Sequence, residues 1–301
     1  MEQASISRAS YMRGVVQVAV AGTLWGTIGP VTAVLYQISN TSPISISFLR
    51  AIIATPIMAF AAYYLLREKS FTLTRRDLPV MMVMGTFTGI SQTCYFAAIS
   101  RIGVTIPTLI AICLAPVIVA VLSFALGYER FSPKVLVALV FALIGTALVV
   151  GVEPESALGR DPIGGVLLSI GSGVTYAGVI ISGRFLARRA HALQINTISL
   201  ATNSVLLLVI GLFTSDLHLS YSSEGWLLFL FLGLVPTAMG YMLFLTGMRT
   251  TSATITGIIT LLEPLTAALL AWVFFGERLT PLGMMGALLL LGAIVVLARG
   301  D

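Results

Sequence analysis

Charged side chains are scarce in this 301-residue sequence and make up 10% of it. A water-soluble domain carries about 25% charged residues, because it must hydrate its surface. Apolar residues account for 57% of the chain, and the mean hydropathy is +1.01. There are too few polar side chains to cover a globule in water, so most of the surface must face lipid. The composition therefore excludes an ordinary soluble domain and predicts an integral membrane protein.

Cysteine and histidine are also scarce, with two of each. Cys94 and Cys113 lie inside apolar segments and are expected to pack as small hydrophobic side chains without a structural disulfide. His191 and His218 lie in polar segments and have no neighbouring partner ligand in the sequence. We therefore expect neither a metal nor another cofactor.

Basic residues are not gathered into a patch, although the net charge is +5. They are scattered through short polar segments, and no platform of aromatic and basic residues accompanies them. Nucleic acid is therefore not an expected partner. The expected partners are the lipid bilayer and a small-molecule substrate, and the oligomeric state stays open, with a monomer as one option.

Apolar runs long enough to span a bilayer, about 20 residues each, occur ten times. The first run has no cleavage site of small residues after it and is expected to remain as a helix. The segments between the runs are too short to fold separately, so one all-α membrane domain is predicted. The ten runs cover residues 14–37, 43–66, 77–99, 103–126, 133–152, 162–186, 193–213, 224–247, 251–274 and 280–298.

Lysine and arginine are distributed unevenly between the two sides of the membrane. With a cytoplasmic amino terminus, thirteen of the seventeen fall on the inside, and only Arg101, Arg160 and Arg278 fall on the outside. The remaining one, Arg50, lies within a span. Because cytoplasmic segments carry the excess of basic residues, both termini are predicted to be cytoplasmic, in a bacterial inner membrane.

An internal repeat relates the two halves of the chain. A shift of 148 positions lays residues 101–133 on residues 249–281 without a gap, so that Pro116 meets Pro264. The run "GYERFSP" of the first segment then meets "FGERLTP" of the second. Pairs of Leu or Ala prove little, but a mid-helix proline together with a Glu-Arg-x-x-Pro segment in the same register is specific.

The repeat divides the chain into residues 1–152 and 153–301, with five helices each. Because five is an odd number, two such units in tandem must have opposite orientations in the membrane. Inverted repeats are a recurring plan of secondary transporters, whose substrate site lies near the bilayer midplane between the repeats. The sequence thus predicts ten helices in two inverted five-helix repeats.

Two stretches resemble a known family. The run "LLEPLTAALLAWVFFGERLTPLGMMGALLLLGAIVVL" at 261–297 resembles the second repeat of EamA-type proteins of the drug/metabolite transporter superfamily. "GTLWGTIGPV" at 22–31 and "SFLRA" at 47–51 resemble the opening of the first repeat. The resemblance implies ten helices, export of small metabolites, and a cavity lined by the first, third and fourth helix of each repeat. Within the family, the chain most resembles YddG-type exporters of aromatic and other apolar amino acids.

Several prolines fall within the predicted spans, where each removes a backbone hydrogen bond and weakens the helix. Proline is common in membrane helices, and a static bend explains most of these positions. Pro116 and Pro264 occupy equivalent points of the two repeats, and for them a hinge in alternating access is an equal alternative. The full set is Pro30, Pro56, Pro107, Pro116, Pro236 and Pro264.

Arg50 and Glu263 are the charged residues that lie well inside the predicted spans. Such residues are functional candidates by default. They could pair with each other, Arg50 could bind backbone carbonyls freed by a proline, or Glu263 could bind a proton or a substrate ammonium group. The sequence does not place the two side chains relative to each other.

Aromatic and polar residues within the spans are candidates for lining the cavity. A buried tyrosine or tryptophan needs a hydrogen-bond partner, which a polar cavity could supply. For each single residue, packing in the core or contact with lipid is favoured over contact with substrate, and about half of the set is expected to line the cavity. The candidates are Trp25, Gln92, Tyr95, Thr108, Ser172, Tyr176, Tyr241, Thr256 and Thr260.

The positions of the lysines restrict the chemical class of the substrate. The two in the chain, Lys69 and Lys134, lie outside the predicted spans, so Arg50 alone could neutralise a phosphate within the membrane. A neutral or zwitterionic, partly apolar substrate is therefore expected, which favours export of small apolar or aromatic amino acids by alternating access.

Three other functions were weighed. A proton-coupled multidrug cation exporter would use Glu263 as its cation site. An intramembrane enzyme would need a Ser/His pair, an Asp pair or a histidine-rich metal site within the spans, and both histidines lie outside them, so we expect no enzyme. A channel would need a ring of charges or a selectivity loop, and the sequence shows neither, although it leaves oligomers open.

Overall fold

The computed structural model describes residues 7–67, 74–102, 105–125, 127, 129, 132–150, 161–276 and 280–298. Every regular element within these residues is a helix, which confirms the all-helical prediction for the described part of the chain. The proposed boundary between residues 152 and 153 lies outside the described residues, as do Glu277 and Arg278 of the second Glu-Arg segment.

Seven of the predicted spans form one continuous helix each. They are α3 (Pro43–Leu66), α4 (Asp77–Ile102), α5 (Thr105–Ala125), α6 (Pro133–Val150), α7 (Pro162–Ala187), α8 (Ala192–Thr214) and α13 (Pro281–Ala298). Two of these helices contain an internal proline and continue through it: Pro56 lies within α3 and Pro116 within α5.

Two spans are broken into two helices each, and both breaks have the same cause. The first span consists of α1 (Arg8–Gly26) and α2 (Ile28–Ile38), and a later one of α11 (Ala253–Ile259) and α12 (Leu262–Phe275). Pro30 and Pro264 are each the third residue of the second helix. Proline lacks the N–H that would bind the carbonyl four residues earlier, so each helix ends one turn before its proline.

A third span contains a π-helical segment. It begins as α9 (Ser223–Leu232), continues as η3 (Gly233–Met239) around Pro236, and ends as α10 (Gly240–Gly247). The Thr237 hydroxyl donates to the carbonyl of Leu232 at 2.7 Å. That carbonyl is the one to which residue 236 cannot donate. In the π-helical register the backbone N–H of Thr237 reaches it, five residues later, and the Thr237 hydroxyl is a second donor.

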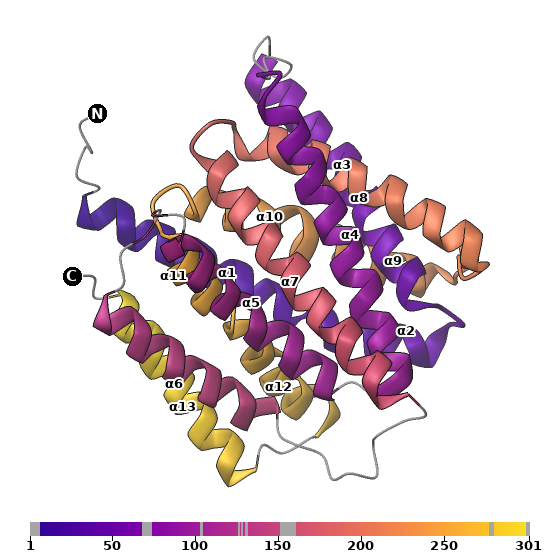
Figure 1. Cartoon of the computed structure of the whole chain (residues 1–301). Helices are drawn as coiled ribbons and strands as arrows, with labels where there is room; N and C mark the ends of the chain where they lie inside the picture. Colours follow the sequence, from indigo (N-terminus) through magenta and orange to yellow (C-terminus); the bar gives the residue numbers. More distant parts are fainter. Residues whose placement is uncertain are drawn as a thin grey trace.

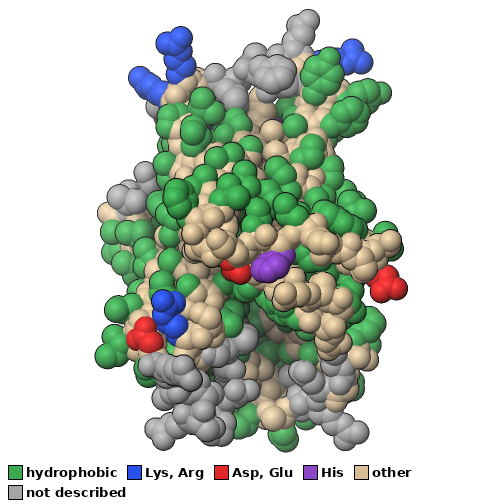
Figure 2. Space-filling model, turned by 90° about the vertical axis from the view of Figure 1, so that its right-hand side faces the viewer, with side chains coloured by type: hydrophobic (Ala, Val, Ile, Leu, Met, Phe, Trp, Pro, Cys, Tyr) green, Lys and Arg blue, Asp and Glu red, His purple; other side chains and the backbone are tan. Residues whose placement is uncertain are grey.

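Nine helical spans within the described residues are long and apolar enough to cross a membrane. Helix α4 is absent from this set although it has 26 residues, because polar side chains such as Ser91 and Gln92 interrupt its apolar face. Figure 2 shows the surface that the spans build, on which hydrophobic side chains dominate and charged ones are few. The chain is therefore a multi-pass membrane protein.

The helices pack in pairs from the two halves of the sequence. Helix α4 packs on α7 and α8, α5 on α7, α3 on α8, and α6 on α13. Helix α1 packs on α10 and α12. Figure 1 shows α6 and α13 side by side at one edge of the bundle. The two ends of the chain meet as well, since the Tyr11 hydroxyl donates to the carbonyl of Leu297 at 2.8 Å.

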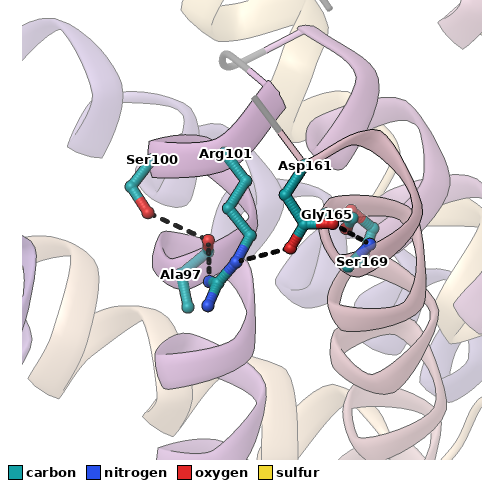
Figure 3. A network of polar contacts seen from close by, with 7 residues as sticks. Ala97, Ser100, Arg101, Asp161, Gly165 and Ser169 are labelled. Carbon is teal, nitrogen blue, oxygen red and sulfur yellow. Dashed lines mark hydrogen bonds and ion pairs between the residues drawn. The ribbon is translucent and has the colours of Figure 1, made fainter. Parts of the chain in front are cut away.

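An ion pair ties the end of α4 to the start of α7 (Figure 3). Arg101 Nε lies 3.3 Å from Asp161 Oδ2, and Arg101 Nη1 donates to the carbonyl of Ala97 at 2.8 Å. Asp161 also caps α7, because its Oδ1 accepts from the Gly164 N–H at 2.9 Å. A carboxylate at a helix N-terminus is favourable by itself, so Asp161 fixes the start of α7.

Candidate functional site

An aromatic cluster lies where α1 meets the π-helical segment. Trp25 Nε1 donates to the carbonyl of Pro236 at 2.9 Å. The indole ring lies 5.2 Å from the ring of Tyr241 and 5.0 Å from that of Phe244, centroid to centroid. A Cβ on Gly240 would lie 2.8 Å from Trp25 Nε1, so only glycine fits there without a shift. The buried indole N–H is thus satisfied by backbone that belongs to the other half of the chain.

Arg50 binds the same segment from α3. Its side chain is 7% exposed, and its Nε donates to the Thr237 hydroxyl at 3.2 Å. Thr237 in turn donates its hydroxyl to the Leu232 carbonyl, to which Pro236 has no N–H to donate. Arg50 thus binds a hydroxyl next to Pro236 and no backbone carbonyl among the described residues, so its predicted role at a carbonyl freed by proline stays a prediction. Thr237 was not among the sequence candidates.

Glu263 lies in the first turn of α12, directly after the break in that span. Its backbone N–H donates to the Thr260 carbonyl at 3.0 Å, which partly replaces the bond that Pro264 cannot make. Helix α1 approaches closely, because a Cβ on Gly26 would lie 2.6 Å from the Glu263 carbonyl oxygen. These contacts hold the backbone of Glu263 and leave its carboxylate for other partners.

Arg50 and Glu263 do not form a direct ion pair. Among the described residues, no basic nitrogen lies within 4.0 Å of the Glu263 carboxylate. The two charges are nevertheless near enough to act on each other, and both act on the Tyr241 phenol. The sequence alternative of direct pairing therefore does not hold in this structure.

Two further tyrosines belong to this neighbourhood. The Tyr95 hydroxyl lies 2.6 Å from Thr108 Oγ1 and so joins α4 to α5. The Tyr176 phenol interacts with the Thr260 hydroxyl and with the charge of Glu263, which also acts on Tyr95. The predicted cavity residues Tyr95 and Thr108 are thus bonded to each other, and so are Tyr176 and Thr260.

Ser172 and Thr256 are used for packing. Ser172 Oγ donates to the carbonyl of Ser91 at 2.9 Å, and Ser91 Oγ donates to the carbonyl of Ser172 at 3.0 Å, which joins α7 to α4. Thr256 Oγ1 lies 2.9 Å from Thr251 Oγ1, at the turn before α11. The predicted cavity role of Ser172 and Thr256 stays a prediction, because both hydroxyls have protein partners.

Gln92 differs from the other candidates. Its Oε1 atom is buried and has no hydrogen-bond partner within the described part of the chain. An unsatisfied buried amide oxygen costs free energy, so a partner outside the protein would stabilise it. Gln92 follows Ser91 on α4 and stays a candidate for a group that contacts substrate.

The helix of Pro116 touches the first half of the span that contains Pro264. A Cβ on Gly257 of α11 would lie 3.5 Å from Pro116 Cα of α5. Helix α5 is continuous at Pro116, whereas the other span is broken just before Pro264. The hinge role of the pair stays a prediction.

Glu129, noted in the sequence only as a marker of the repeat, caps α11. Its carboxylate accepts from the Ala253 N–H at 2.6 Å and from the Thr254 N–H at 3.3 Å. Nearby, the Arg184 guanidinium donates to the Met248 carbonyl, and Glu129 attracts Arg184. The cap could not be found from spacing, since the partners are separated by 124 positions.

The sequence also matches known proteins along nearly its whole length. The model of the EamA-like transporter family matches residues 12–151 and again residues 163–299. The chain belongs to the EamA-like transporter family. It is 27% identical to the uncharacterized transporter YwfM of Bacillus subtilis over 282 residues. The aligned residues cover 93% of this chain and 92% of that protein.

Other relatives carry similar names. The pseudopaline exporter CntI of Pseudomonas aeruginosa is 27% identical over 274 residues, which cover 91% of this chain and 92% of that protein. An uncharacterized transporter of Archaeoglobus fulgidus is 30% identical over 220 residues, covering 73% and 76%. A solved crystal structure matches with a TM-score of 0.81 and 20% identity, over 97% of this chain and 99% of that one. These family members are transporters by name, and the structural match shows the shared fold.

Proposed function

We propose that this protein exports small apolar or aromatic amino acids and related metabolites by alternating access. The path runs through the centre of ten transmembrane helices, which form two inverted five-helix repeats over residues 1–152 and 153–301. The observation that carries the proposal is the pair of charged residues within the spans, Arg50 and Glu263, which come from the two halves of the chain and are both linked through α1 to the same part of the bundle.

Three observations support the inverted repeat. The family model matches the chain twice, once in each proposed repeat. The helix pairs are also reciprocal, since α4 packs on α7 as α10 packs on α1 of the other half. In addition, the equivalent helices α5 and α11 contact each other at Pro116. Two repeats related by an approximate two-fold symmetry, in which each helix of one half has an equivalent in the other, would account for all three observations.

Helix α4 is the tenth span in this proposal. Its 26 residues extend about 39 Å at 1.5 Å per residue, more than the roughly 30 Å of a bilayer core. It packs between α7 and α8, which cover its polar side chains. Tyr11 bonds to Leu297, so the two termini share one end of the bundle, as an even number of crossings requires. We place that end in the cytoplasm of a bacterial inner membrane, following the distribution of basic residues.

The charges inside the bundle favour a zwitterionic substrate over a phosphorylated one. A phosphate carries up to two negative charges, and strong binding in a membrane calls for several cations. The central neighbourhood offers the single guanidinium of Arg50, with the acidic Glu263 beside it. The relative named as a pseudopaline exporter supports export as the direction of transport.

A proton-coupled multidrug cation exporter is the second candidate. The observation that favours it is the carboxylate of Glu263, which has no hydrogen-bond partner among the described residues and could hold a lipophilic cation.

Efflux from liposomes tests both functions. Vesicles with the purified protein are loaded with labelled phenylalanine, leucine or alanine, or with a lipophilic cation such as tetraphenylphosphonium, with and without a pH gradient. The proposal expects saturable efflux of phenylalanine and leucine above that of protein-free vesicles. Efflux of the cation alone would favour the second candidate, and efflux of neither would refute both.

A further inference from the structure

The guanidinium of Arg50 has unused hydrogen-bonding capacity. Arginine carries five N–H donors, and within the described residues the one hydrogen bond of its side chain uses Nε, toward Thr237. The two terminal NH₂ groups therefore have no protein acceptor there, although the side chain is 7% exposed. Burying a cation without an acceptor costs free energy. A planar anionic group would stabilise the two terminal NH₂ groups, which we call the free fork of Arg50.

Glu263 presents the opposite deficit. Its carboxylate accepts no hydrogen bond from the described residues, and no basic nitrogen lies within 4.0 Å of it. It lies ten residues after the start of α11, which puts it about 15 Å into the span. A carboxylate at that depth needs a donor or a cation. The Tyr241 phenol is under the influence of both Glu263 and Arg50, and the Tyr176 phenol under that of Glu263.

Contacts of α1 hold the two residues in one neighbourhood: Thr237, which binds Arg50, follows Pro236, to which Trp25 bonds, and the adjacent Gly26 packs on the Glu263 carbonyl. The charged groups of Arg50 and Glu263 are nevertheless more than 4.0 Å apart, which leaves room for a group between them. An α-amino acid carries its ammonium and carboxylate groups about 3 Å apart. With a charge-assisted hydrogen bond of about 2.8 Å at each end, it spans roughly 8 Å from donor nitrogen to acceptor oxygen.

We propose that Arg50 and Glu263 form a split ion pair that binds the backbone of a zwitterionic α-amino acid. The free fork of Arg50 binds the substrate carboxylate, and Glu263 binds its ammonium group. The inference rests on the proposed transport function and names the site and the chemical class of the substrate within it.

Charge balance explains why a zwitterion fits better than an ion of either sign. A zwitterion gives each buried charge a partner and leaves the region neutral. A simple amine would satisfy Glu263 and leave Arg50 unpaired, and a simple acid would do the reverse. An unpaired charge in a low-dielectric site costs several kcal/mol, so both analogues are rejected by the charge that they leave behind.

The neighbours of Arg50 suit an apolar side chain on the substrate. Thr237 belongs to the same π-helical segment as Pro236, to which Trp25 bonds, and the rings of Tyr241 and Phe244 pack on that indole. Trp25 and Phe244 are buried in this cluster, 4% and 0% exposed, so Tyr241, at 9%, is the ring of the three that could contact an apolar side chain of the substrate.

The first experiment needs no variant. Binding of L-phenylalanine to the full-length protein in detergent is measured against phenethylamine, which lacks the carboxylate, and 3-phenylpropionate, which lacks the ammonium group. The inference expects phenylalanine to bind about 10- to 100-fold more tightly than either analogue, the value of one charged hydrogen-bonding contact. Equal binding of phenylalanine and the amine would refute the role of Arg50, and equal binding of phenylalanine and the acid would refute that of Glu263.

Two variants then assign each end of the substrate. Arg50→Gln is expected to weaken phenylalanine about 10- to 100-fold while phenethylamine binds as well as before or better. Glu263→Gln is expected to weaken phenylalanine similarly and to leave phenylpropionate unchanged. Thr55→Val and Thr266→Val are the matched controls, because these hydroxyls bind carbonyls of their own helices, those of Ala51 and Leu262. The controls are expected to retain the binding of all three probes.

A purely structural role of Arg50 predicts a different result. If Arg50 served only to hold Thr237, the Thr237→Val variant would reproduce the Arg50→Gln phenotype. Under the inference, Thr237→Val keeps the preference for phenylalanine over phenethylamine, because the terminal nitrogens remain. If Arg50→Gln fails to fold, the Thr237→Val variant and the binding of the three probes to the wild-type protein still distinguish a substrate-binding role of Arg50 from a purely structural one.

The outcomes separate the inference from the proposed function. Transport of phenylalanine without discrimination among the three probes would overturn the split ion pair and leave amino-acid export standing. A wild-type protein that neither binds nor transports phenylalanine would overturn both.

Discussion

The close contact between α6 and α13 makes a strong prediction for Gly286→Ala. A Cβ at residue 286 would lie 2.6 Å from the Gly145 carbonyl oxygen and 2.9 Å from the Val149 backbone nitrogen. Because two of its nearest neighbours are backbone atoms, a side-chain rotation cannot relieve the overlap, and the two helices must separate. Without a hydrophobic drive between helices in lipid, association depends on such close packing.

The expected cost follows from two opposing effects. Overpacking of a tight contact costs about 1–3 kcal/mol. Alanine gains up to about 1 kcal/mol over glycine in a helix, which offsets part of that cost. The free energy of unfolding should therefore fall by roughly 1–2 kcal/mol, which corresponds to a decrease in Tm of about 3–6 °C.

Gly292→Ala is the matched control in the same helix. No atom lies within 4 Å of a Cβ at residue 292, so this variant keeps the wild-type Tm or raises it. Thermal unfolding of the purified variants in detergent, followed by size-exclusion chromatography of the heated samples, gives both Tm values. Equal Tm values for the two variants would refute the assignment of close packing to Gly286.

Three further predictions concern the helix ends and the prolines. Glu129→Gln should lower the Tm by about 2–4 °C, because it removes the charge that caps α11, while the exposed Glu224→Gln should change it less; equal shifts would contradict the cap. Burial, with help from the charge of Arg249, lowers the pKa of His191 from its ordinary value of 6.5, and His191 Nδ1 accepts from the Leu193 N–H. Stability should therefore fall as the pH drops below about 6.5, since the unfolded chain then binds more protons, and His191→Asn, measured by urea unfolding at pH 7.5 and 5.5, should reduce that pH dependence. Pro116→Ala and Pro264→Ala should each slow liposome efflux while leaving the Tm within a few degrees, and full efflux in both would remove the hinge hypothesis.

The membrane spans could be predicted from the sequence because each depends on a local run of apolar residues. The interruptions could be predicted only in part. Pro30 and Pro264 break their spans, whereas Pro116 lies in a continuous helix. What a proline does depends on which group takes over the carbonyl that it frees, and at Pro236 the donors belong to Thr237. Which donor binds a carbonyl freed by proline is decided by the fold, and the spacing of residues in the sequence does not indicate it.

The candidate site, too, could be predicted from the sequence only in part. Arg50 and Glu263 were recognisable because a charge is conspicuous in an apolar run. Their geometry was not, since the contact of Arg50 with Thr237 joins residues 187 positions apart. Thr237 and Glu129 were missed for this reason, while Thr256 was selected as a polar residue in a span and proved to bind Thr251.

The cap on α11 also bears on how the chain is made. Glu129 precedes Ala253 by 124 residues, so at about 5–20 residues per second it leaves the ribosome roughly 6–25 s before the helix that it caps. The last helices therefore enter a membrane in which their acceptor is already present. A nascent chain that stops short of Ala253 would hold Glu129 without its amide partners, so late truncations should leave a first half that is inserted but incompletely stabilised.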